Sequence, residues 1–147
     1  QPLAALLVDG LKAHALWAEL QAKPPVIVPV PLHLHREKER GFNQCKLLAQ
    51  EVSAATGWMI LPHLQRSRET RSQVGLDADA RRENVREAFA WLSDAGDAPD
   101  RVLLIDDVCT TGATLSECVA ALKQMGSVEV HVAAVARAAG PEADAAI

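Results

Sequence analysis

Two adjacent carboxylates followed by a threonine-rich loop are the residues of this sequence best suited to do chemistry. Asp106 and Asp107 follow the apolar run 102–105, and residues 110–114 read Thr-Thr-Gly-Ala-Thr. Ligands of open α/β sheets bind at the carboxyl ends of strands, where paired carboxylates need water or a ligand. Free amides and the positive dipole end at a helix start favour a phosphate. The pattern predicts a sugar-phosphate site, with carboxylates for the sugar hydroxyls and the loop for the phosphate.

Each part of this pattern also has a plain structural explanation. Asp107 or Thr110 alone would be an ordinary helix N-cap residue. Cys109 lies inside the loop, where a packing role is favoured over catalysis. Other phosphate-binding loops do not fit, because neither Gly-x-x-x-x-Gly-Lys-Ser/Thr nor Gly-x-Gly-x-x-Gly occurs. The complete string is therefore far more informative than any of its parts.

The elements around the string form a strand, helix, strand unit. The pattern predicts a strand over 101–105, a loop over 106–111, a helix over 112–125 with a core stripe of Leu115, Val119 and Leu122, and a strand over 128–135. Such a crossover joins parallel strands. The same patterns predict an amphipathic helix over 3–20 packed on the sheet, a strand over 26–30, a helix over 42–56, and strands over 58–61 and 89–92.

Single residues add detail to these elements. Pro29 requires an edge position, a bulge or a strand end, because proline has no amide to donate. Asn43 and Gln44 either cap the second helix or line the substrate side. The apolar, buried face of that helix is expected at residues 48, 52 and 55. Residues 63–86 are expected to form a mobile loop or hairpin, followed by a short helix near 77–87.

Length and composition indicate a single cytoplasmic domain over 1–147. The 147 residues suit one compact domain. No apolar run is long enough to cross a membrane, and the start lacks a signal-peptide pattern. The three cysteines show no metal-ligand spacing, which indicates reduced thiols.

Basic residues gather in the middle of the chain. The net charge is −4, yet ten of the fifteen lysines and arginines fall between Arg36 and Arg86. Arginine suits bidentate phosphate contacts, so this belt indicates an anionic ligand, with a solvated surface as the alternative. Direct nucleic-acid binding is disfavoured, because the net charge is negative and few aromatic residues are available for stacking.

The string at 102–114 resembles the signature of type I phosphoribosyltransferases without departure. The resemblance implies their α/β fold, a central, mostly parallel sheet flanked by helices, with a small flexible hood. It also implies that the acids act as the catalytic pair and hold the ribose hydroxyls of phosphoribosyl diphosphate (PRPP). The residues implied in binding the 5′-phosphate are Cys109, Thr110, Thr111, Gly112, Ala113 and Thr114.

Further pieces are most similar to the ComF (competence protein F, GntX-like) branch of that superfamily. They are 28–32, the Arg-Gly-Phe-Asn-Gln segment at 40–44 with the following Leu-Leu-Ala, 66–70 with Gln73, and 82–85 with Phe89. Members often carry a zinc-ribbon-like segment before this domain, which is absent from 1–147. The resemblance implies Mg²⁺ bound with PRPP, reaching the protein through PRPP rather than through dedicated ligands, with a contribution open to Asp106 and Asp107.

The diphosphate end of PRPP should meet the turn after the first strand and the hood. The turn is expected over 31–35, including Pro31 and Leu32, with Lys38 and Arg40 as nearby candidate cations or, alternatively, as part of a solvated charged helix end. The resemblance places the hood at Arg66, Arg68 and Arg71, for which an ordinary basic surface loop is the alternative. Hood closure would exclude water and add positive charge.

Two functions fit these features. The first is an Mg²⁺-dependent enzyme that transfers phosphoribose from PRPP to a nitrogen acceptor and releases pyrophosphate. The second is a non-catalytic PRPP-binding or regulatory component of DNA uptake, which would contact competence-machinery proteins. The acceptor is unidentified, and a homo-oligomer is compatible with either function.

Overall fold

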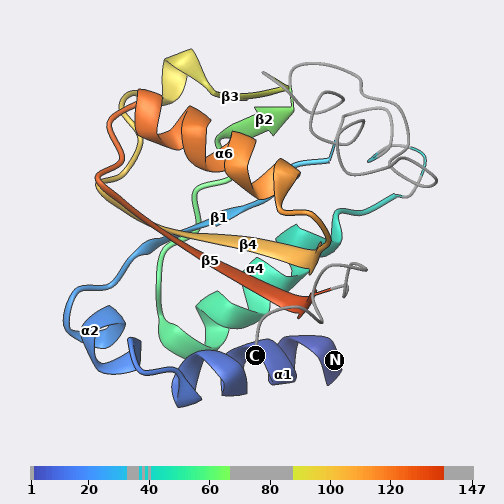
Figure 1. Cartoon of the computed structure of the whole chain (residues 1–147), viewed down its shortest axis with the longest axis vertical. Helices are drawn as coiled ribbons and strands as arrows, with labels where there is room; N and C mark the ends of the chain where they lie inside the picture. The colour runs from blue at the N-terminus through green and yellow to red at the C-terminus, as the bar shows by residue number, and fades with distance from the viewer. Residues whose placement is uncertain (1, 33–36, 38, 40, 67–87, 138–147) are drawn as a thin grey trace, which may run out of the picture.

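A three-stranded parallel sheet forms the centre of the protein (Figure 1). The structure is a computed structural model that describes residues 2–32, 37, 39, 41–66 and 88–137. The strands are β1 (Val26–Pro29), β4 (Arg101–Cys109) and β5 (Glu129–Arg137), in the order β1-β4-β5. The crossover through α6 (Ala113–Gln124) makes β4 and β5 parallel, as the sequence predicts.

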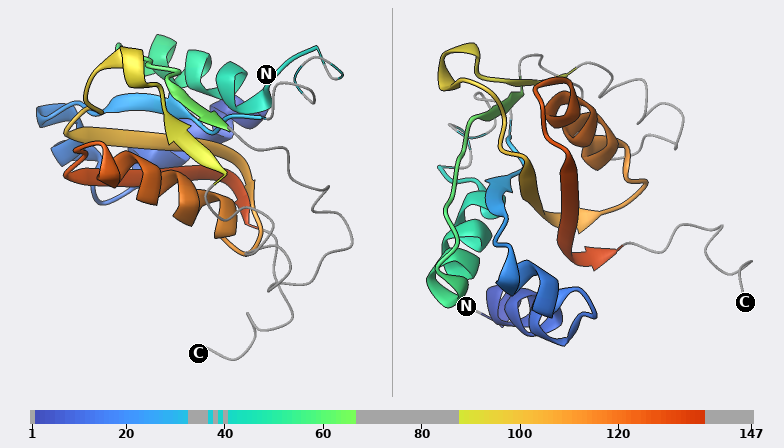
Figure 2. Two further views of the ribbon diagram at one scale, coloured as in Figure 1. Left: turned by 90° about the horizontal axis from the view of Figure 1, so that it is seen from above. Right: turned by 90° about the vertical axis from the view of Figure 1, so that its left-hand side faces the viewer.

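Two layers cover the sheet (Figure 2). One face packs against α1 (Pro2–Ala13), α4 (Gln44–Thr56) and the short α2 (Trp17–Ala22). The other face packs against α6 and a two-stranded antiparallel sheet of β2 (Leu64–Arg66) and β3 (Phe89–Trp91). A 3-10 turn, Ser93–Ala95, follows β3.

Strand β4 is buried on both faces, which explains its unbroken apolar start. Val102 and Leu104 face α6 and the small sheet, whereas Leu103 and Ile105 face α1 and α4. All four side chains are at most 1% exposed. Because both faces are covered, β4 must be central, and this burial fixes the position of the acids that follow it.

The first helical segment differs from the expected single helix over 3–20. It divides into α1 and α2, because the ring Nδ1 of His14 accepts a hydrogen bond from the Leu16 amide at 3.2 Å and turns the chain. The buried face of α1 is Ala4, Leu7 and Val8, whereas a four-residue spacing predicts a face of Leu3, Leu7, Leu11 and Ala15, and Leu3 is exposed. The expected packing on the sheet is confirmed.

Some of the other predicted elements are confirmed with shifted edges, but the strand predicted over 58–61 does not form. Pro29 is the last residue of β1, which meets one of its permitted positions. Helix α4 buries residues 45, 48, 49 and 52, and Ala55 is exposed, contrary to the prediction. Within 58–61, Ile60 makes only an isolated bridge to Ile27. The helix expected near 77–87 lies outside the described residues.

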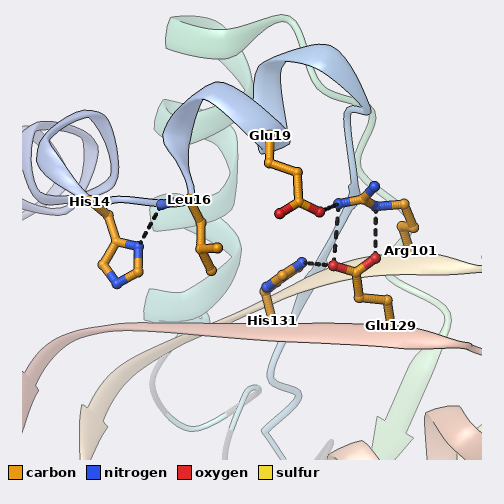
Figure 3. A network of polar contacts seen from close by, with 6 residues as sticks. All are labelled: His14, Leu16, Glu19, Arg101, Glu129 and His131. Carbon is orange, nitrogen blue, oxygen red and sulfur yellow. Dashed lines mark hydrogen bonds and ion pairs between the residues drawn. The ribbon is translucent and has the colours of Figure 1, made fainter.

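An ion-pair network ties α2 to the starts of β4 and β5 (Figure 3). The Arg101 guanidinium lies 3.1 Å from Oε1 of Glu19 and 3.2 Å from Oε2 of Glu129. His131 Nε2 lies 2.6 Å from the same Glu129 carboxylate. The Arg101 side chain is 18% exposed, so the network is only partly screened by solvent.

We expect Arg101→Ala to lower the free energy of unfolding by about 1 kcal/mol, because it leaves two glutamates without their shared cation. Chemical denaturation at low and high salt measures this, and the loss should shrink in salt. Lys46→Ala is the matched control, since Lys46 pairs with Glu37 at a more exposed site. An equal loss in both variants would contradict the network's role.

Among the described residues, no helix is long and apolar enough to span a membrane.

Candidate functional site

The acidic pair lies within β4, not in the loop expected over 106–111. Strand β4 continues to Cys109 because β5 remains paired with it, from Asp106 opposite Ala134 to Cys109 opposite Arg137. Strand β1 instead ends at Pro29, opposite Ile105. The acids therefore begin where the pairing of β4 with β1 ends.

The Asp106 carboxylate is nearly buried and is held at one oxygen. It is 7% exposed, and its Oδ1 accepts the Asp107 amide at 2.9 Å and the Cys45 thiol at 3.5 Å. Burial, with the charge of Asp107 adding to it, raises the pKa of Asp106 to about 6. A hydrogen bond from a sugar hydroxyl to this carboxylate would replace hydration that burial has removed.

Asp107 differs from its neighbour in exposure. It is half-buried, and its Oδ1 accepts the Val108 amide at 2.7 Å. Although consecutive strand residues usually point to opposite sides of a sheet, one oxygen of each carboxylate lies within 4.8 Å of the other, so both can meet one ligand. A vicinal pair of ribose hydroxyls offers two donors that such an arrangement can bind.

The threonine loop leads from β4 into the N-terminus of α6. Gly112 caps the helix with φ +78°, a left-handed conformation that L side chains rarely adopt. Thr110 and Thr111 are exposed, and the Ala113 amide donates to Oγ1 of Thr111 at 3.4 Å. Amides at a helix start and exposed hydroxyls next to a carboxylate pair fit a phosphate bound beside a sugar.

The end of β1 reaches the same edge. The Val30 amide donates to the Ile105 carbonyl at 2.9 Å, so Pro31 and Leu32 leave β1 beside the acidic pair. Asn43 caps α4 by accepting the Cys45 amide at 2.9 Å, and its Nδ2 donates to Val30 O at 3.1 Å. The capping role is thus confirmed for Asn43, while Gln44 is half-buried in the first turn.

Of the five cations predicted to meet the diphosphate, only Arg66 is among the residues that the structure describes. Lys38, Arg40, Arg68 and Arg71 lie outside the described residues. Arg66 is described, and it differs from a hood residue exposed in a flexible loop. It belongs to β2, is 9% exposed, and places its guanidinium 5.3 Å from the Phe89 ring centroid. Pairing of β2 with β3 explains this, because it fixes the backbone of Arg66.

The positive charge of Arg66 reaches a core thiol that the charge of Asp106 also reaches. Burial raises the pKa of the Cys118 thiol, the charge of Asp106 adds to that rise, and the charge of Arg66 opposes it. Cys118 is a fully buried residue of α6. Arg66 and Asp106 are therefore both within electrostatic reach of one core thiol.

Sequence reasoning missed Cys45 as a neighbour of the acids. Its sulfur and one oxygen each from Asp106 and Asp107 lie within 4.8 Å of one another. Burial raises the pKa of this thiol, so it stays protonated. A protonated thiol is a poor metal ligand, whereas carboxylate oxygens suit Mg²⁺. No signal in the string at 102–114 identifies Cys45, because the contact spans 61 positions.

Comparison with known proteins gives one family match and several relatives. A family model described as phosphoribosyl transferase domain matches residues 68–145, which include the acids and the loop. The chain is 41% identical over 135 residues to competence protein F of Haemophilus influenzae, covering 88% of this chain and 56% of that protein. It is 37% identical over 117 residues to DNA utilization protein YhgH of Escherichia coli strain K12, covering 74% and 48%. The chain spans about half the length of these curated relatives.

Solved structures share the architecture at low sequence identity. Adenine phosphoribosyltransferase from Saccharomyces cerevisiae superposes with a TM-score of 0.59 at 15% identity, covering 93% of this chain and 69% of that one. Purine phosphoribosyltransferase from Pyrococcus horikoshii gives 0.57 at 18% identity, covering 92% and 73%. At such identities the likeness concerns the fold alone. It confirms the predicted fold class, a parallel sheet flanked by helices.

Proposed function

Because this chain belongs to the phosphoribosyl transferase domain family, in its competence protein F-like branch, we propose that its acidic site binds PRPP with Mg²⁺. We propose further that it transfers the phosphoribosyl group to a nitrogen acceptor and releases pyrophosphate. The observation that supports this most is the placement of Asp106 and Asp107 where the pairing of β4 with β1 ends, directly before the helix-entry loop of α6.

Each end of the donor has a counterpart in the chain. Asp106 and Asp107 accept the ribose hydroxyls, and the amides and hydroxyls of Cys109, Thr110, Thr111, Gly112, Ala113 and Thr114 surround the 5′-phosphate. Pro31 and Leu32 lie beside the acids, where the diphosphate would sit, with Lys38, Arg40, Arg66, Arg68 and Arg71 as its candidate cations.

Transfer then needs positioning more than covalent chemistry from the protein. The acceptor nitrogen forms a bond to the anomeric carbon as the bond from that carbon to the diphosphate oxygen breaks, and the proton of the nitrogen passes to solvent. Positive charge develops on the ribose ring, and the two carboxylates stabilise it electrostatically. Mg²⁺, when bound with PRPP, neutralises the leaving diphosphate.

A second candidate is a PRPP-binding component of DNA uptake without turnover. Relatives named competence protein F and DNA utilization protein favour it. The structure also offers a cavity of about 530 Å³ between α1, α2 and β5, but neither acid nor any loop residue lines it. In this second candidate the chain binds PRPP and acts through the bound complex, without transferring the phosphoribosyl group.

We expect calorimetry with excess Mg²⁺ to show PRPP binding to the chain, at least about tenfold more tightly than ribose 5-phosphate, since the diphosphate adds charge-assisted contacts. ATP, which carries phosphates without a free 5-phosphoribose, serves as the control ligand and should bind more weakly than PRPP. Absence of PRPP binding, or equal affinity for ATP, would contradict the proposal.

Turnover separates the two candidates. Pyrophosphate release is measured with PRPP and Mg²⁺ against purine and pyrimidine bases, amines and ammonia. Acceptor-dependent release supports the enzyme. Tight PRPP binding without release from any acceptor supports the binding component.

A further inference from the structure

A buried thiol contacts the acidic pair from a different part of the fold. Cys45 is the second residue of α4 and is 4% exposed. Its sulfur lies 3.5 Å from Oδ1 of Asp106, the oxygen that also accepts the Asp107 amide. Two donors therefore bind Oδ1 of Asp106, and neither of them binds Oδ2.

The thiol is itself fixed by a closed set of hydrogen bonds. The Cys45 amide donates to Oδ1 of Asn43, whose Nδ2 donates to the Val30 carbonyl. The Val30 amide donates to the carbonyl of Ile105, the residue before Asp106. Since Asn43 is 3% exposed, this path is protected from water. The helix N-cap, the end of β1 and the strand carrying the acid thus form one unit.

The chemistry of the thiol suits a donor and not a nucleophile. A catalytic cysteine needs exposure and a thiolate, whereas burial raises the pKa of Cys45 and keeps its proton. Asp106 and Asp107 add to that rise. The thiol proton can therefore be donated in a hydrogen bond to Asp106. Because that hydrogen bond is directional, it restricts rotation of the carboxylate.

We propose that Cys45 is a positioning residue, whose thiol orients Asp106 so that its other carboxylate oxygen meets a ribose hydroxyl. The inference rests on the proposed function and concerns discrimination between sugars. A carboxylate held in one orientation favours ribose over a sugar that lacks a hydroxyl at that place, and a rotating carboxylate discriminates less.

The test compares ribose 5-phosphate with 2-deoxyribose 5-phosphate by calorimetry on four proteins. Wild type should prefer ribose 5-phosphate, and Cys45→Ala should reduce the ratio of the two affinities by roughly fivefold or more. Cys45→Ser keeps a donor of similar size and should restore the ratio to within about twofold of wild type. Cys118→Ala removes a buried thiol from the same core cluster as Cys45, and it should leave the ratio unchanged.

The outcomes distinguish positioning from packing. If Cys45 only fills space, Cys45→Ala will weaken both sugar phosphates equally and Cys45→Ser will give no selective rescue, which overturns the inference. Thermal melting of every variant checks that it is folded, and Cys45→Val, which fills the site without a donor, replaces Cys45→Ala if that variant does not fold. Failure of wild type to bind PRPP would overturn the proposed function itself. PRPP binding with an unaltered ratio in Cys45→Ala would overturn only the role of Cys45.

Discussion

Replacing Asp106 and Asp107 together by asparagine should weaken PRPP binding by at least about a hundredfold. A hydrogen bond to a charged acceptor contributes about 1.5–3 kcal/mol, and the double substitution removes the charge from two acceptors. Asparagine keeps the shape and the backbone contacts of each side chain, so the loss reports charge. Calorimetry of PRPP with Mg²⁺ on both proteins measures it.

An acid outside the site provides the matched control for that experiment. Asp97 is exposed in the connector between β3 and β4, and Asp97→Asn changes the net charge of the protein without touching the site. It should bind PRPP as wild type does. Equal affinity of the double variant and wild type would refute the assignment of the acids, and a comparable loss in Asp97→Asn would show a general charge effect.

The central unit could be predicted from sequence because its signals are local. The fully apolar start of β4 indicates a strand covered on both faces, and Gly112 marks the turn into α6. Both depend on residues adjacent in the chain. The same holds for Asn43, whose capping role follows from its position before a helical pattern.

Other features depend on pairing between distant segments, which sequence patterns do not contain. The acids belong to β4 because β5 continues beside them, so a turn-like composition was overridden by strand pairing. Arg66 is buried because β2 pairs with β3, although its neighbours in sequence are polar. Cys45 meets Asp106 only because α4 packs against the sheet.

Asparagine at position 106 alone should make the protein more stable above neutral pH, by about 3 kcal/mol. The reason is the raised pKa of Asp106, from 3.8 to about 6, which burial chiefly causes. The folded state binds this proton more tightly than the unfolded chain does. The stability that proton binding at Asp106 contributes is therefore fully present below about pH 3.8 and is lost as the pH rises through about 6.

The pH dependence separates this prediction from a general effect of the substitution. Above pH 7 wild type holds a buried negative charge that the asparagine variant lacks, so the stability difference should be largest there. It should decrease as the pH falls from 7 to 4, because the wild-type carboxyl becomes neutral. Urea unfolding at several pH values measures the difference, and in Asp97→Asn it should show no comparable change with pH. A difference independent of pH would show that burial does not disfavour the Asp106 charge.

Higher stability together with weaker PRPP binding in Asp106→Asn would mean that the same buried charge disfavours folding and favours the ligand. The charge of a residue that is 7% exposed and lies beside a second acid is unfavourable for folding, although the Cys45 thiol donates a hydrogen bond to it. A hydrogen bond from a sugar hydroxyl to the Asp106 carboxylate offsets part of the cost of burying its charge. PRPP should therefore stabilise wild type more than it stabilises Asp106→Asn. Thermal melting with and without PRPP tests this directly. The cost of burying the Asp106 charge would then be part of how the site favours its ligand.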